Sequence, residues 1–100
     1  MANRDEERKA AAKAQTVLST QTPSTAHTAE IVDALRAAVV VANAATVKGF
    51  SSEAALNILR GDAATRLNAV AGSLARRRVM SQDLIDRAKL AVAAWLHALA

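Results

Sequence analysis

The chain has no cysteine, one proline, three glycines and only two aromatic residues, Phe50 and Trp95. Without cysteine it forms no disulfide, no thiolate metal site and no cysteine nucleophile. Its longest uncharged runs, 37–47 and 90–100, are each 11 residues long, whereas a membrane-spanning helix needs about 20. The first residues are charged and lack the apolar segment of a secretory signal. We therefore expect a soluble protein, cytoplasmic or held within a larger assembly.

The chain contains many alanines and few large apolar side chains. Hydrophobic residues make up 52% of the 100-residue chain, and 26 of them are alanine. Each alanine buries little area, and burial stabilises by only about 25 cal/mol per Å². The sequence predicts one domain with a thin core of Leu, Val and Ile, in which alanine allows helices to approach closely. Such a domain gains part of its stability from a partner.

The segment 31–48, IVDALRAAVVVANAATVK, is the centre of the predicted fold. Its apolar residues recur with helical spacing and cover nearly the whole circumference, because Val40 and Val47 fall within the polar strip. The alternative is a buried strand, since Val39–Val41 is β-branched. Flanking alanines and the length of the periodic pattern favour a helix.

The remaining segments predict an all-α fold, a small antiparallel bundle of three main helices with an N-terminal helical arm. The expected parts are an arm over 1–20, a Thr/Pro linker over 21–28 and a bundle domain over 29–100. Asp5, Glu6 and Glu7 occupy the first turn of the arm, where the helix dipole favours anions. The arm has a weak apolar face, so it is either a solvated segment or one that becomes ordered against a neighbouring subunit.

Two helices complete the predicted bundle. One spans about 52–78, with Leu56, Leu67 and Leu74 on its apolar stripe; a break at Gly61 is the alternative. The other begins at the cap residue Ser81 and follows a turn at 79–81.

Several apolar residues lie where a lone bundle needs polar ones. Val40 and Val47 share a stripe of the central helix with Ala37 and Ala44, and Leu90 is out of phase with the buried stripe of the last helix. Single exposed apolar residues are common, but a continuous stripe forms a seam. The sequence therefore predicts partner binding through Ala37, Val40, Ala44, Val47 and Leu90.

Little in the sequence supports catalysis. Its only histidines are His27 in the linker and His97 near the end, and no zinc-protease helix, phosphate loop or nucleophile elbow is present. We expect no enzyme, no catalytic residue, no metal ligand, no cofactor and no small-molecule substrate.

Most of the net charge of +4 lies in 76–100, where five basic and two acidic residues give +3. These basic residues are Arg76, Arg77, Arg78, Arg87 and Lys89. The first three are consistent with a solvated cationic last turn that complements the helix dipole. Alternatively, the five together bind phosphate, as in nucleic-acid binding, or an acidic protein partner.

The region 74–90, LARRRVMSQDLIDRAKL, resembles a helix-turn-helix. Ala75 is the small residue that the motif requires, Met80 and Ile85 match its buried positions, and Ser81 matches its cap. The resemblance implies DNA binding through the second helix. However, Val79 stands where the motif usually has glycine, Arg78 stands at an apolar position, and two of the four residues facing DNA are carboxylates.

The sequence thus favours a non-enzymatic helical assembly protein, a structural subunit of a homo-oligomer or of a larger complex such as a virion. We expect it to bind itself or a larger protein assembly and not a membrane. The alternative is a small basic nucleic-acid-binding protein with a helix-turn-helix-like hairpin.

Overall fold

The computed structural model describes residues 4–20, 28–46, 54–76 and 82–99. Within these ranges every regular element is a helix: α1 spans Arg4–Thr20, α2 Thr28–Ala45, α3 Ala54–Ala75 and α4 Gln82–Leu99. The all-α helical bundle predicted from the sequence is confirmed. No helix of the described ranges combines the length and apolar character that crossing a membrane requires.

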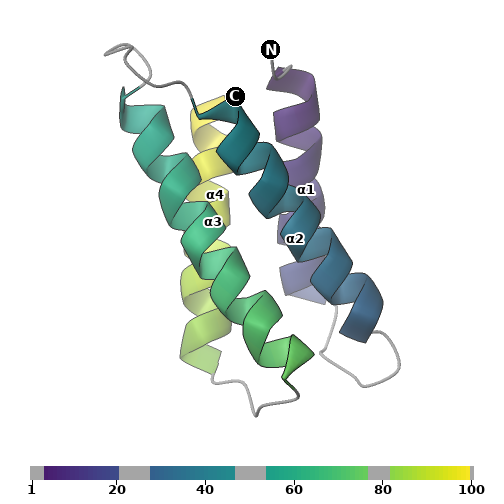
Figure 1. Cartoon of the computed structure of the whole chain (residues 1–100). Coiled ribbons are helices and arrows are strands. Elements are labelled where there is room, and N and C mark those ends of the chain that lie inside the picture. Colours follow the sequence, from purple (N-terminus) through teal and green to yellow (C-terminus); the bar gives the residue numbers. More distant parts are fainter. Residues whose placement is uncertain (1–3, 21–27, 47–53, 77–81, 100) are drawn as a thin grey trace.

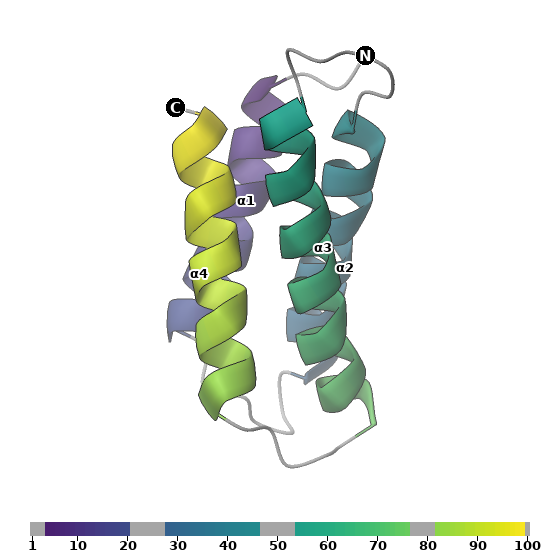
Figure 2. The ribbon, with the colours of Figure 1, turned by 90° about the vertical axis from the view of Figure 1, so that its left-hand side faces the viewer.

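The four helices alternate in direction and lie side by side along the long axis of the molecule (Figures 1 and 2). Its extents are 41 × 22 × 20 Å. α1 packs on α2 and α4, and α3 packs on the same two helices, so α1 and α3 are diagonally opposite. This is the antiparallel up-down-up-down bundle. The beginnings of α1 and α3 and the ends of α2 and α4 share one end of it.

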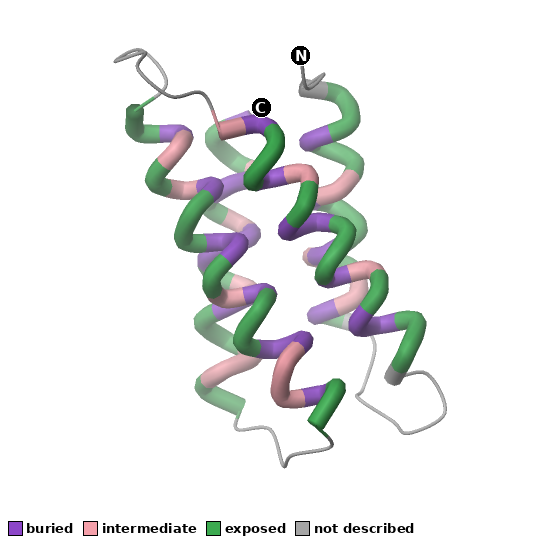
Figure 3. Tube along the Cα trace, viewed as in Figure 1, coloured by how far each residue is buried: buried purple, intermediate pink, exposed green. Residues whose placement is uncertain are grey.

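The core is continuous along the inward faces of all four helices (Figure 3). Its fully buried large side chains include Leu35, Leu67, Val92, Trp95 and Leu99. Alanine fills much of the remaining space, at positions 11, 14, 38, 42, 63, 64, 71, 88 and 91. These small side chains let the helices approach closely, so a chain with few large apolar residues still closes a core.

The central segment forms α2, as the alanine-flanked pattern predicts. Seven of the eight residues that the helical spacing places on its buried side are buried, and the eighth, Val41, is half-buried; the seven are Ile31, Val32, Leu35, Ala38, Val39, Ala42 and Ala45. Val40 is 66% exposed. A valine-rich run therefore forms a helix here because its neighbours favour helix and its buried face has helical rather than alternating spacing.

The prediction of three main helices plus an arm is wrong in its count, because α1 is a fourth member of the bundle. Ala11, Ala14 and Leu18 of α1 are buried against the same chain, with Ala10 and Val17 packed beside them. Neither a solvated arm nor docking on a neighbouring subunit is needed to order this helix. The face predicted from the sequence, Ala10, Ala14, Val17 and Leu18, was partly correct: Ala14 and Leu18 are buried, whereas buried Glu7 and Ala11 were not predicted.

α3 is one continuous helix through Gly61 and Gly72, which excludes the predicted alternative of a break at Gly61. Its buried stripe contains the expected Leu56, Leu67 and Leu74. A Cβ atom added at either glycine would meet nothing within 4 Å. Neither glycine is therefore required for helix packing within the chain.

The predicted cap at Ser81 and the predicted turn at 79–81 lie outside the described residues.

Replacing Gly61 by alanine is expected to raise the free energy of unfolding by about 0.5–1 kcal/mol, because alanine restricts the unfolded chain and the site is open. The reverse change at exposed Ala69 of the same helix, Ala69→Gly, is the matched control and should lower it by a similar amount. Urea unfolding followed by circular dichroism measures both. A loss of stability in Gly61→Ala would contradict the open surface around Gly61.

Candidate functional site

A carboxylate is buried at the end of the bundle where the chain's two ends lie. Glu7 of α1 is 1% exposed and Arg60 of α3 is 3% exposed. Glu7 Oε1 accepts a hydrogen bond from Arg60 Nε at 2.6 Å, and Oε2 accepts one from Arg60 Nη2 at 3.0 Å. This two-point contact is the strong geometry for an arginine–carboxylate pair. It joins the two helices that are diagonally opposite in the bundle.

Trp95 of α4 contacts the same carboxylate. Its indole Nε1–H donates to Glu7 Oε1 at 2.8 Å, and its ring is fully buried. The remaining guanidinium nitrogen, Arg60 Nη1, donates to Asn57 Oδ1 at 2.9 Å. No buried side-chain nitrogen or oxygen in the described ranges lacks a partner. Glu7, Arg60, Asn57 and Trp95, hereafter the buried polar cluster, thus connect α1, α3 and α4 with every donor and acceptor satisfied.

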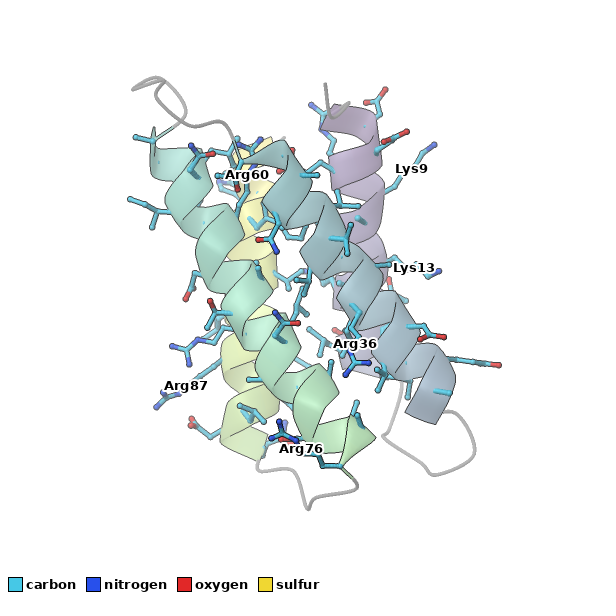
Figure 4. All side chains as sticks on the ribbon, in the orientation of Figure 1. Lys9, Lys13, Arg36, Arg60, Arg76 and Arg87 are labelled. Atoms are coloured by element: carbon cyan, nitrogen blue, oxygen red, sulfur yellow. The ribbon has the colours of Figure 1, made fainter. Side chains whose placement is uncertain are left out.

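Helical spacing explains how these residues meet. Glu7 precedes Ala11, Ala14 and Leu18 at intervals of four, three and four, so it lies on the buried face of α1. Arg60 occupies the same phase of α3 as buried Leu56 and Ala64. Figure 4 shows Arg60 near the shared end of the bundle, among the helices rather than at the outer surface.

The sequence analysis missed this cluster. It assigned Glu7 to a favourable interaction with the helix dipole and did not single out Arg60. The sequence does contain a signal for this cluster. Glu7 and Arg60, which have opposite charges, each lie at a position where the helical spacing predicts an apolar residue, and Trp95 lies on the apolar face of a third helix. Opposite charges in buried phases pair, because an unpaired buried charge is strongly unfavourable.

A second contact holds α1 at the same end. Arg8 Nε donates to the backbone carbonyl of Leu99 at 2.8 Å, and Arg8 Nη1 contacts Asp5 Oδ1 at 3.0 Å. The last carbonyls of a helix have no partner within the helix and carry its negative dipole end. Arg8 therefore caps α4 from α1.

The predicted partner-binding residues on α2 that the structure describes share one exposed face. Ala37, Val40 and Ala44 are all exposed and follow one another at intervals of three and four. We call these three residues the α2 stripe. Val47, predicted on the same stripe, lies outside the described residues.

The structure does not bring Leu90 together with the α2 stripe. Leu90 is 72% exposed on α4, and α2 and α4 are diagonally opposite, with no close approach of their backbones in the described ranges. Ile58 of α3, which the sequence analysis did not single out, is 71% exposed. Among these exposed large apolar residues, Val40 is the one that lies on the described part of the stripe predicted from the sequence.

An open groove of ≈ 490 Å³ between α1 and α2 adjoins the stripe. Ala37 belongs to both. The groove is lined by apolar Val17, Ile31, Ala34 and Ala37 and by charged Lys13, Glu30 and Asp33. It is therefore an apolar surface bordered by charges of both signs.

Three of the five predicted phosphate-binding residues lie in the described ranges. Arg76 is exposed at the end of α3, Lys89 is half-buried, and Arg77 and Arg78 lie outside the described residues. Arg87 is exposed and contacts Asp83 Oδ2 through Nε at 2.9 Å, so a carboxylate already partly neutralises it. Figure 4 shows Arg76 and Arg87 projecting in different directions.

The predicted helix-turn-helix joins α3 to α4, and these two helices lie side by side and antiparallel (Figures 1 and 2). A helix-turn-helix instead places its two helices at about 90–120°. Its expected DNA-facing residues contact one another here, since Gln82 Nε2 donates to Asp86 Oδ1 at 2.9 Å. Nucleic-acid binding through Arg76–Arg78, Arg87 and Lys89 stays a prediction from the sequence.

No group of three or more histidine, aspartate or glutamate side chains in the described ranges is placed to hold a metal ion. No protein-family model, no curated protein and no solved structure matches the chain. The chain has a satisfied buried ion pair that organises the bundle and an apolar stripe that the bundle leaves exposed.

Replacing Glu7 by glutamine tests the buried polar cluster. The amide keeps the size of the side chain but leaves the Arg60 guanidinium buried without its counter-charge, so we expect the free energy of unfolding to fall by about 3–5 kcal/mol. Urea unfolding measures it, with Trp95, the only tryptophan, as a fluorescent probe of the site.

Glu6→Gln is the matched control. Glu6 is exposed, lies in the same helical turn and carries the same charge. Removing its charge therefore measures only the effect of the helix dipole and of the net charge on stability. We expect a change of about 0.3–1 kcal/mol. Equal effects of the two substitutions would show that the buried pair does not stabilise the fold.

Proposed function

We propose that this protein is a non-enzymatic helical assembly protein, a structural subunit that associates with a second copy of itself through the α2 stripe. One observation carries the proposal: Val40 is 66% exposed at the centre of a stripe whose other members, Ala37 and Ala44, are also exposed and apolar. The bundle already has four helices around its core, and this face of α2 is not among the surfaces that they cover.

The spacing of the stripe suits a second helix. Intervals of three and four residues place side chains along the seam of two helices packed at a shallow angle. In a two-fold interface the same patch faces itself. Antiparallel α2 helices related in this way bring the two Val40 side chains together, and the small Ala37 and Ala44 let the backbones approach.

The groove beside the stripe extends the same surface. Its border carries a cation, Lys13, and the carboxylates Glu30 and Asp33. A patch with both signs of charge is able to complement a second copy of itself, whereas a patch of one sign repels its copy. Such border charges contribute orientation and association rate more than affinity.

The size of the stripe limits its strength. Stable interfaces usually bury about 1,200–2,000 Å² in total, and one helix face with its groove is small by comparison. We therefore expect association that depends on protein concentration, and that becomes stable when several copies or a larger assembly supply further contacts.

Replacing Val40 by aspartate tests the proposal. Light scattering after size-exclusion chromatography is expected to show an average mass that rises with concentration in the unmodified chain. Val40→Asp should reduce this rise, because it places a charge at the centre of an apolar contact. Asn43→Asp is the matched control: it lies at an exposed position three residues away on the same helix, outside the stripe, and should leave the rise unchanged.

A chain that stays monomeric at all accessible concentrations, with Val40→Asp indistinguishable from it, contradicts self-association. Leu90→Asp separates the two exposed surfaces. If it reduces the mass increase and Val40→Asp does not, the contact lies on α4 and the proposed role of the α2 stripe is wrong.

A further inference from the structure

α1 is held in the bundle differently from the other helices. Its buried side chains are Glu7, Ala11, Ala14 and Leu18, of which only Leu18 is a large hydrophobic residue. By contrast, α3 buries eight residues and α4 buries five, including Trp95. Because apolar burial scales with area, the docking of α1 depends unusually strongly on one polar contact, that of Glu7 with Arg60 and Trp95.

The surface under α1 has a definite chemical requirement. Arg60 Nε, Arg60 Nη2 and Trp95 Nε1 all point their hydrogens at one carboxylate. When α1 leaves, Arg60 and Trp95 lose the carboxylate that they share, and the apolar faces that α1 covered are exposed to water. A helix that brings a carboxylate in this position restores these contacts. Beyond it, the site accepts small residues at intervals of four and three, where Ala11 and Ala14 lie.

We propose that α1 is exchangeable between copies: the α1 of one chain leaves its own bundle and docks, through Glu7, in the Arg60–Trp95 site of a second copy. The second copy is the occupant that fits, because its α1 supplies the carboxylate, the alanines and the Arg8 cap on Leu99 together. α1 is the first helix of the bundle, so its departure leaves the packing of α2 on α3 and of α3 on α4 intact. Exchange of an identical element is a low-cost route to a dimer.

This inference does not depend on the α2 stripe, and its test removes the stripe. All chains carry Val40→Asp, so association through Val40 does not contribute. One chain also carries Glu7→Arg and the other Arg60→Glu. Within each chain the buried pair then has like charges, Arg with Arg or Glu with Glu. In an exchanged dimer of the two, both sites have opposite charges, and one is the native Glu7–Arg60 pair.

Each chain alone is expected to be monomeric, with a lower thermal midpoint and with Trp95 emission shifted to longer wavelength. An equimolar mixture should show twice the monomer mass by light scattering, a higher midpoint than either chain, and Trp95 emission shifted back. The chain with both charge reversals, which restores an opposite pair within itself, should show the same mass as the chain that carries Val40→Asp alone. A mixture whose mass, midpoint and emission are the average of its two components overturns the exchange.

A second measurement applies if circular dichroism shows that both charge-reversed chains are unfolded and stay unfolded when mixed. Because the chain has no cysteine, Arg8→Cys and Ala98→Cys can be placed singly in two chains that keep Glu7 and Arg60. Arg8 reaches the backbone of Leu99 in the structure, so a short bismaleimide joins these sites only across a docked α1. After the two are refolded together, cross-linked heterodimer supports the exchange, and its absence overturns it.

Discussion

The carboxylate of Glu7 is the contact on which the arrangement of the bundle depends. It accepts hydrogen bonds from Arg60 across the diagonal and from Trp95 on the neighbouring helix. Apolar contacts between alanine-rich faces are weak and tolerate sliding, whereas a buried ion pair is stable only with its partners at hydrogen-bond distance. A shift of α1 by one turn, or its rotation to another face, would leave two buried charges unpaired. The cluster thus determines where α1 docks and in which register.

The composition explains why such a contact is needed. A buried methyl or methylene group contributes about 0.8 kcal/mol, and a buried leucine about 1.5–3 kcal/mol. α1 brings one buried leucine and two fully buried alanines, so its apolar face alone gives little preference for one docking geometry. Replacing a buried pair by apolar residues often preserves stability. The pair in this protein therefore specifies the geometry more than it adds to the total stability.

The same scarcity of large side chains shapes the outer surface. α2 has more apolar circumference than its two neighbours, α1 and α3, cover, and Val40 with Ala37 and Ala44 remains exposed. The exposed stripe and the exchangeable helix that we propose are two routes to association in one small domain. The first adds a surface, and the second reuses a site that the monomer already has. Both follow from the small apolar area that a core with few large side chains buries.

Much of the fold could be predicted from the sequence, because helical periodicity is a local property. The spacing of apolar residues predicted helices over 31–48, about 52–78 and from Ser81 onward, and the structure has helices over 28–45, 54–75 and 82–99. It also predicted that Val40 is exposed. The position of α1 and the partners of Glu7 could not be predicted, because Glu7 is 53 residues from Arg60 and 88 residues from Trp95 along the chain. Only the packing of α1 on α2 and α4 decides that a first-turn glutamate becomes a buried ion-pair partner. The sequence determines the charge of each residue, but whether that residue is buried depends on which helices pack against its own.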